Sequence, residues 1–420
     1  MRHNAPHTVI IFDLMFKTDL DKAGMSAAAL ERLTDYIRAD VNTGAIPGAV
    51  IWIARRDALA CFEAIGFAER SAQRPMQRDS IFRIASMTKP VTAVAAMMLQ
   101  EQGRLLLADP ISRYLPEFKD LQVGTEFEMD GERQLRLEAA RQPITIQDLM
   151  RHTAGFTYGD FGDSLVQREY RRAKPMEPYQ SNAEMAAKLV RLPLAFQPGT
   201  TFEYGMSTDV LGRVVEVVSG TTLDEFFATH ITTPLGMVDT GFSVPAAAKA
   251  RCASPQRAPT AIARRPAAAD VPPEARRWPS GGGGLSSTAP DYSRFCRMLL
   301  NGGALDGVRI LSRHGIELMT HNHLPPGIAY GAHTAELGHG APLPQLGQGY
   351  GLCFGVRMEP GLASAQGSVG DYYWSGITGP SFWIDPREQL IVVFMLQETD
   401  IERRARYRSL LRALVYPALT

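Results

Sequence analysis

The sequence lacks long apolar runs, an excess of either charge, and closely spaced cysteines. No segment reaches the roughly 18 consecutive apolar residues of a membrane-spanning helix, so we expect no membrane span. Lysine and arginine (44) balance aspartate and glutamate (44), and no basic stripe indicates a nucleic-acid partner. The four cysteines show neither a CxxC motif nor metal-ligand spacing, which predicts reduced, mostly structural thiols.

The apolar segment near the N-terminus is too short for a secretory signal. Residues 9–12 are apolar, but Asp13 ends the run and no small-residue cleavage site follows. A cytoplasmic protein is therefore the expectation. With 420 residues, the chain can bury a large core in one unit or in two domains.

Strand patterns at both ends of the chain enclose a helical middle. Residues 49–54 and 59–67 resemble two strands joined by a polar turn, and four more strand-like segments lie between residues 351 and 396. Residues 119–143 resemble a polar surface excursion, and residues 250–280 an extended loop. This order predicts a mixed α/β (α+β) fold with an antiparallel sheet flanked by helices. The expected parts are a discontinuous α/β domain (25–110 and 281–420), a mainly helical inserted domain (111–280) and an irregular N-terminal lead-in (1–24).

The first candidate site lies at the start of a predicted apolar helix. Ser86 precedes Lys89 by three residues, and residues at this spacing are neighbours on one helix face. Pro90 fits the first helical turn, and the free N–H of Ser86 at the helix start could face an oxyanion. The apolar neighbours of Lys89 predict burial, which lowers a lysine's pKa and makes it a usable base. The alternative is a surface helix with an ordinary serine and lysine.

Two later segments could complete this site. Tyr204 follows a turn and precedes an apolar helix, and a tyrosine beside a lysine cation loses its proton more readily. Taken alone, the segment fits a packed core tyrosine slightly better. In the segment 373–380, glycines such as Gly376 let the backbone approach a ligand, and the N–H of Ile377 is a candidate second oxyanion donor. A glycine-containing β-hairpin explains that segment equally well.

The order of these segments resembles the serine β-lactamase and penicillin-binding family, and most closely the family VIII carboxylesterases, which are similar to class C β-lactamases. The similarity spans about residues 26–415. The segments that carry it, besides Ser86–Lys89, Tyr204 and 374–376, are 152–155, 196–199, 209–212, 234–237, 281–285 and 383–386. The resemblance implies a β-lactamase/transpeptidase-like fold. It also implies that Ser86 is the nucleophile, that Lys89 assists its deprotonation, and that Tyr204 is the general base and acid. The N–H groups of Ser86 and Ile377 would form the oxyanion hole.

Two departures from the lactamase pattern favour neutral esters as substrates. Met206 stands where that pattern has an asparagine, and Trp374 stands where it has a lysine or histidine. A cation there would hold a substrate carboxylate, whereas an indole offers an apolar face to an acyl or alcohol group. The expected substrate-binding residues are Tyr158, Met206, Trp374, Ser375 and Gly376.

We therefore expect a serine carboxylesterase that cleaves short-chain esters through an acyl-enzyme, with no cofactor and no metal. The expected partner is a small-molecule ester, with no nucleic acid and no membrane, and the oligomeric state stays open. The alternatives are a β-lactamase or D-alanyl-D-alanine carboxypeptidase, an acyltransferase on the same scaffold, and a non-catalytic scaffold protein. Residues 162–165 spell the GDSL esterase signature around Ser164, but without the strand and helix that should follow it.

Overall fold

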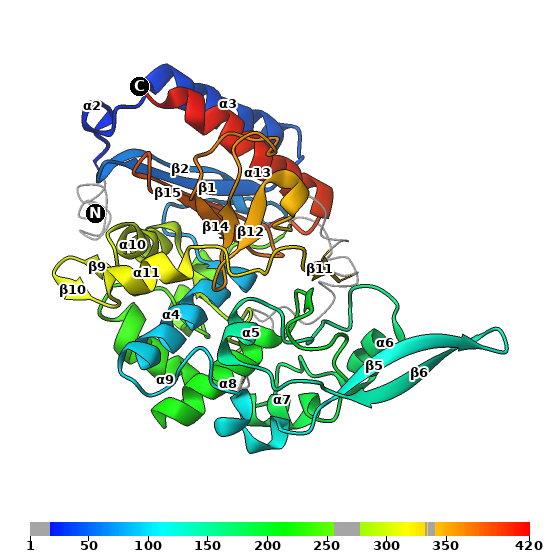
Figure 1. The fold of residues 1–420 in the computed structure, drawn as a ribbon. Helices are drawn as coiled ribbons and strands as arrows, with labels where there is room; N and C mark the ends of the chain where they lie inside the picture. The colour runs from blue at the N-terminus through cyan, green and yellow to red at the C-terminus, as the bar shows by residue number, and fades with distance from the viewer. Residues whose placement is uncertain (1–16, 256–277, 332–333, 335–340) are drawn as a thin grey trace.

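One antiparallel sheet joins the two ends of the chain (Figure 1). In this computed structural model its strands lie in the order β12-β13-β14-β15-β16-β1-β2-β3, and each neighbouring pair is antiparallel. The strands are β1 (Gly48–Arg55), β2 (Ala58–Glu69), β3 (Arg74–Pro75), β12 (Gln348–Tyr350), β13 (Gly355–Arg357), β14 (Tyr372–Ser375), β15 (Ser381–Asp385) and β16 (Leu390–Leu396). The structure describes residues 17–255, 278–331, 334 and 341–420.

Most of the helices lie where the sequence pattern predicts them. They are α2 (Leu20–Ala23), α3 (Ala27–Asn42), α4 (Thr88–Glu101), α5 (Ile146–Met150), α6 (Leu165–Ala173), α7 (Asn182–Leu189), α8 (Ser207–Ser219), α9 (Leu223–Phe227), α10 (Ala289–Leu300), α11 (Arg313–Met319) and α13 (Ile401–Val415). The expectation of an irregular lead-in is wrong for α2, which Asp19 caps through its side chain. Residues 1–16 of that lead-in lie outside the described residues.

Helix α6 was not predicted, because its sequence is mostly polar and only Val166, Gln167 and Tyr170 are buried. Its N-terminus is stabilised by a capping box, in which the Ser164 side chain accepts from the Gln167 N–H and the Gln167 side chain bonds back to Ser164. The serine of the GDSL segment therefore has a structural role here.

Helices cover both faces of the sheet, which explains why its central strands are apolar throughout. Strands β1 and β16 are buried along their whole length and pair from Ala49↔Leu396 to Arg55↔Leu390. Helices α3 and α13 pack together over one face, while α4 and α10 lie on the other side (Figure 1). A strand covered on both faces needs apolar side chains at every position rather than at alternate ones.

Short strand pairs lie outside this sheet. The longest is the hairpin of β5 (Gln122–Met129) and β6 (Glu132–Ala139), which forms the predicted excursion and projects from the molecule (Figure 1). The other pairs are β4 (Phe82–Arg83) with β8 (Ser286–Ser287), β7 (Thr201–Phe202) with β11 (Ala329–Tyr330), and β9 (Ala304–Leu305) with β10 (Val308–Arg309). In the expected loop 250–280, residues 256–277 lie outside the described part, and a 3₁₀ helix (Ala246–Arg251) reaches its start.

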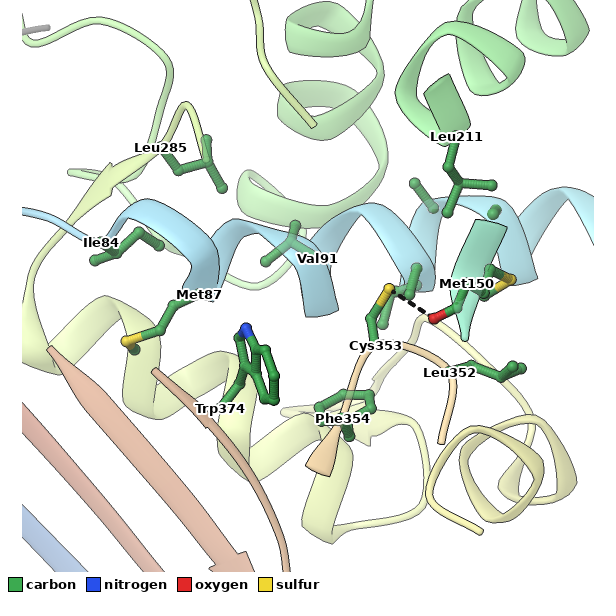
Figure 2. Close-up of a cluster of buried hydrophobic side chains, with 14 of the residues drawn as sticks. Ile84, Met87, Val91, Met150, Leu211, Leu285, Leu352, Cys353, Phe354 and Trp374 are labelled. Carbon is green, nitrogen blue, oxygen red and sulfur yellow. Dashed lines mark hydrogen bonds between the residues drawn. The ribbon is translucent and has the colours of Figure 1, made fainter. Parts of the chain in front are cut away.

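The core consists of two apolar clusters, one on each side of the sheet. Helix α4 lies within the larger cluster, in which its own Val91 lies near Met87 and Trp374 (Figure 2). The same view shows the Cys353 thiol bonded to the Met150 carbonyl at 3.4 Å. All four cysteines are free, as predicted. Across the described residues, no helix combines the length and the apolar character that crossing a bilayer requires.

Candidate active site

Ser86 lies in a tight turn directly before α4. The segment Ala85–Met87 is a 3₁₀ helix, and α4 itself begins at Thr88, two residues later than the sequence suggested. Ala85 has a φ of 44°, a left-handed conformation that is uncommon for a residue with a Cβ. Ser86 remains partly exposed at this turn, whereas Lys89 is fully buried. The turn therefore presents one hydroxyl at the surface above a buried lysine.

The Lys89 ammonium connects three separate segments of the chain. Its Nζ donates to the Ser86 Oγ at 3.4 Å, to the Tyr158 hydroxyl at 3.1 Å and to the Gly282 carbonyl at 2.7 Å. It also lies 4.6 Å from the centre of the Tyr204 ring. These contacts use the three donors of an ammonium group and hold it at the Ser86 hydroxyl.

These contacts reverse the expected shift of the Lys89 pKa. Burial alone disfavours the charged form, but Tyr158, Tyr204 and Asp209 together outweigh burial and raise the pKa of Lys89 above its ordinary value. Burial likewise raises the pKa of the Tyr158 hydroxyl. The prediction that burial makes Lys89 a base of lowered pKa is therefore wrong. The raised pKa favours the ammonium form of Lys89.

Asp209, to which sequence reasoning gave no role, holds the turn that contains Ser280 and Gly282. The Asp209 carboxylate accepts from the Gly282 N–H at 3.0 Å and from the Ser280 hydroxyl at 2.5 Å. Asp209 is buried at the start of α8, so these bonds are shielded from water. The segments 209–212 and 281–285 were noted only as parts of a family pattern. The contact between them appears only when α8 and the glycine turn fold together.

Tyr204 is buried against Lys89 and Trp374. Its hydroxyl accepts a hydrogen bond from the Trp374 Nε1–H at 3.3 Å, and the two rings lie 5.4 Å apart. The backbone N–H of Tyr204 donates to Thr334 at 2.9 Å, and the His152 ring lies 4.7 Å from the Tyr204 ring. The Lys89 ammonium and the Trp374 N–H thus both contact Tyr204. A phenolate on Tyr204 would need such partners, because they stabilise its negative charge.

The loop after β14 reaches the Ser86 turn. A Cβ added to Gly376 would lie 2.4 Å from the Ile84 carbonyl oxygen, so only glycine allows this close approach. Ile377 follows, and the Arg404 guanidinium donates to its carbonyl at 2.6 Å. Among the described residues, the backbone N–H groups of Ser86 and Ile377 have no hydrogen-bond acceptor. Both are therefore free to bind an oxyanion.

One of the expected substrate-binding side chains points away from the site, and another is fully buried. Side chains alternate along a strand, so Trp374 faces α4 while its neighbour Ser375 faces α13, where its hydroxyl accepts from Arg408 at 2.7 Å. Met206 is fully buried where α8 begins, and its carbonyl accepts from the Asp209 and Val210 N–H groups. The site therefore gathers Ser86, Lys89, Tyr158, Tyr204, Trp374, Gly376 and Ile377 but not the Ser375 hydroxyl.

His152 is a further neighbour that the sequence reasoning left without a role. It is fully buried with a φ of 56°, and its Nδ1 accepts from the Gly205 N–H at 3.4 Å, directly after Tyr204. The only sequence signal for a role of His152 was its position in the segment 152–155, which carries part of the family resemblance. Elsewhere in the described residues, no three His, Cys, Asp or Glu side chains gather where they could hold a metal ion.

The structure combines an antiparallel sheet with a buried helix that has a serine and a lysine at its start. This combination is typical of the serine enzymes related to penicillin-binding proteins. Comparison with known proteins agrees with this class. Residues 33–416 match the model of the Beta-lactamase family, and the chain belongs to that family. The predicted resemblance and the β-lactamase/transpeptidase-like fold are confirmed.

Three relatives cover most of the chain. Protein Rv1367c of Mycobacterium tuberculosis (strain H37Rv) is 36% identical over 86% of this chain and 88% of its own. Esterase EstB of Burkholderia gladioli is 30% identical over 91% of this chain and 93% of its own. The solved structure of EstCE1, "a hydrolase with promiscuous acyltransferase activity", is 27% identical, has a TM-score of 0.74, and covers 92% of this chain and 98% of its own. The protein is thus a serine hydrolase of the β-lactamase family with esterase relatives.

Proposed function

We propose that this protein is a carboxylesterase of the family VIII type that cleaves short-chain esters through an acyl-enzyme on Ser86. The observation that carries the proposal is the position of the Lys89 ammonium, bonded at once to the Ser86 hydroxyl, to Tyr158 and to Gly282. A serine activated by neighbouring proton-transfer groups is the arrangement that covalent acyl transfer needs.

In the acylation step, Tyr204 acts as a phenolate paired with the Lys89 ammonium. The Ser86 Oγ attacks the ester carbonyl carbon, and its proton passes to the Tyr204 oxygen, which becomes a neutral phenol. Lys89 cannot take that proton as an ammonium ion, but it stabilises negative charge on Tyr204 and orients the Ser86 hydroxyl. The carbonyl oxygen becomes an oxyanion, which the free N–H groups of Ser86 and Ile377 receive. Tyr204 then returns the proton to the leaving alcohol as the C–O bond breaks.

In the deacylation step, the same groups act in reverse order on water. Tyr204 removes a proton from the water that attacks the acyl carbon, and the proton returns to the Ser86 Oγ as the acid leaves. An alcohol in place of water would give acyl transfer, which is our second candidate activity. The esterase relative EstCE1, whose title names a promiscuous acyltransferase activity, favours this candidate.

Neutral esters suit this site better than β-lactams. Trp374 stands where the lactamase pattern has a lysine or histidine that holds a substrate carboxylate. Its side chain is 4% exposed and its indole N–H donates to the Tyr204 hydroxyl, so this position supplies no cation. Met206 likewise brings no side-chain amide to the site.

The test compares kcat/KM for p-nitrophenyl esters of increasing acyl length with kcat/KM for nitrocefin, in wild type and in Ser86→Ala. We expect the highest values for short acyl chains, little activity on nitrocefin, and loss of all ester hydrolysis in Ser86→Ala with an unchanged Tm. Adding an alcohol should divert the acyl group into a new ester. A Ser86→Ala variant that keeps wild-type activity contradicts the proposal.

A further inference from the structure

A second polar cavity lies on the far side of β14 from Ser86. It has a volume of about 70 Å³ and lies between the strands, the segment 363–365 and α13. Tyr373 and Trp383 face it, and they are paired in register on neighbouring strands, on the face opposite Trp374. Arg357, Arg408 and Arg412 also line it. Trp374, Ser381 and Phe382 also border the cavity, while the Trp374 ring packs against Tyr204, so β14 and β15 lie between the cavity and the Ser86 side of the sheet.

The arginines of the cavity outnumber their carboxylate partners. Arg357 and Arg412 both bind Asp371, at 2.9 Å and 2.8 Å, and Asp371 is fully buried. Arg408 has no carboxylate within ion-pair distance among the described residues, and its one hydrogen bond goes to the Ser375 hydroxyl at 2.7 Å. One buried carboxylate thus contacts two of the three guanidinium groups but offsets only one positive charge, and Arg408 has no carboxylate partner at all.

Arg408 is partly buried, and a charge that is partly removed from water is costly unless it is paired. A guanidinium carries five N–H donors in a plane, and one hydroxyl acceptor satisfies only a small part of them. An anion placed in the cavity would supply both the missing charge and the missing acceptors. Bidentate bonds between arginine and a carboxylate or phosphate are the strong, charge-assisted kind.

We propose that this cavity binds a small oxyanion, a carboxylate or a phosphate group, held chiefly by Arg408. The volume suits a group of a few heavy atoms, because each water molecule of the liquid occupies about 30 Å³. The aromatic rings of Tyr373 and Trp383 limit water contact and strengthen the electrostatic attraction there. The site is separate from the hydrolytic centre, so its occupation does not depend on the proposed esterase activity.

The experiment titrates the full-length protein with inorganic phosphate and, separately, with butyrate, by isothermal calorimetry at constant ionic strength. We expect at least one of the two anions to bind wild type. Arg408→Gln should weaken that binding at least tenfold, because it removes the only unpaired charge. The matched control is Arg406→Gln, an exposed arginine on the same helix whose Nη2 donates to the Tyr36 hydroxyl; it should bind as wild type does. Binding of butyrate alone would indicate a planar carboxylate ligand, and binding of phosphate would indicate a tetrahedral one.

A second measurement separates this cavity from the active site. Saturating anion should leave the rate at which a fluorophosphonate labels wild-type protein unchanged, since the two sites lie on opposite faces of β14. If Arg408→Gln does not fold, Arg408→Lys replaces it in the experiment. Lysine keeps the positive charge but lacks the planar guanidinium group, so we expect a smaller but measurable loss of anion affinity. The proposal is overturned by an absence of binding for both anions up to tens of millimolar. Equal affinity in the Arg408 variants, or anion protection against the fluorophosphonate, also overturns it.

Discussion

At the scale of single residues, the site depends on which groups surround Lys89. The sequence predicted that Lys89 is buried, and it is fully buried. The predicted direction of its pKa shift was wrong, because that direction depends on Tyr158 and Asp209, which approach Lys89 only in the folded chain. In the proposed mechanism, Lys89 therefore acts as a cation and Tyr204 carries the proton.

Lys89→Ala and Tyr204→Phe should each lower kcat for a p-nitrophenyl ester by at least ~10²-fold, the usual size of a general acid–base contribution. Lys89 stabilises the charge that Tyr204 must carry, so the two losses should not multiply. Steady-state kinetics of both single variants and the double variant test this. A double variant whose loss equals the product of the single losses would show that the two groups act independently.

Trp374→Phe should lower kcat by up to about tenfold while KM changes little. The substitution keeps an aromatic ring in the core but removes the N–H that donates to the Tyr204 hydroxyl, a bond worth about 1 kcal/mol. The control is Trp52→Phe, a similarly buried tryptophan whose Nε1 has no partner among the described residues. If KM rises and kcat is unchanged, Trp374 acts by substrate packing and not through Tyr204.

At the scale of whole elements, α13 supports the catalytic loop from behind. Arg404 donates to the Ile377 carbonyl and Arg408 to the Ser375 hydroxyl, so one helix face holds both the end of β14 and the turn after it. The apolar residues Leu410, Leu411 and Leu414 of α13 are a local signal of an amphipathic helix. Its arginines gave no signal of this contact, because nothing in their spacing distinguishes a buried guanidinium from a solvated one.

Arg404→Ala should therefore lower kcat several-fold at nearly constant KM, because the free Ile377 N–H loses its fixed orientation. Arg404→Lys should restore part of the loss, since an ammonium can also donate to the carbonyl. Arg406→Ala, an exposed neighbour, should match wild type. Kinetics at several ester concentrations separate kcat from KM. An unchanged kcat in folded Arg404→Ala would show that α13 does not orient the Ile377 N–H.

Helix α10 should make the stability of the protein depend on pH. Burial raises the pKa of Asp291, near the start of this helix, to about 6, although Thr240 and the Asp239 N–H donate to it. The folded protein thus binds a proton more tightly than the unfolded chain does, so this residue's contribution falls as pH rises from about 4 to 6. Chemical unfolding of Asp291→Asn across this range should lose that dependence, which amounts to about 3 kcal/mol at most. An identical pH slope in the variant and in wild type contradicts the shift.

At the scale of the whole molecule, the sheet and the site come from segments far apart in the chain. Strands at both ends and helices between them were predictable, because their periodicities are local. The contacts that build the site were not, since Gly282 lies 193 residues from Lys89, and Trp374 lies 170 residues from Tyr204. The order of motifs supplied this long-range information through the family resemblance. It did not supply the direction in which Ser375 points or the support that Asp209 gives.

The most direct test of the account is to identify the residue that becomes acylated. The full-length protein is incubated with a fluorophosphonate probe, digested and analysed by mass spectrometry, with Ser86→Ala and Ser164→Ala treated in parallel. The account predicts one adduct, on the peptide that contains Ser86, which is absent from Ser86→Ala and unchanged in Ser164→Ala. An adduct at Ser164 or another residue, with Ser86 unlabelled in protein that still hydrolyses esters, would contradict it.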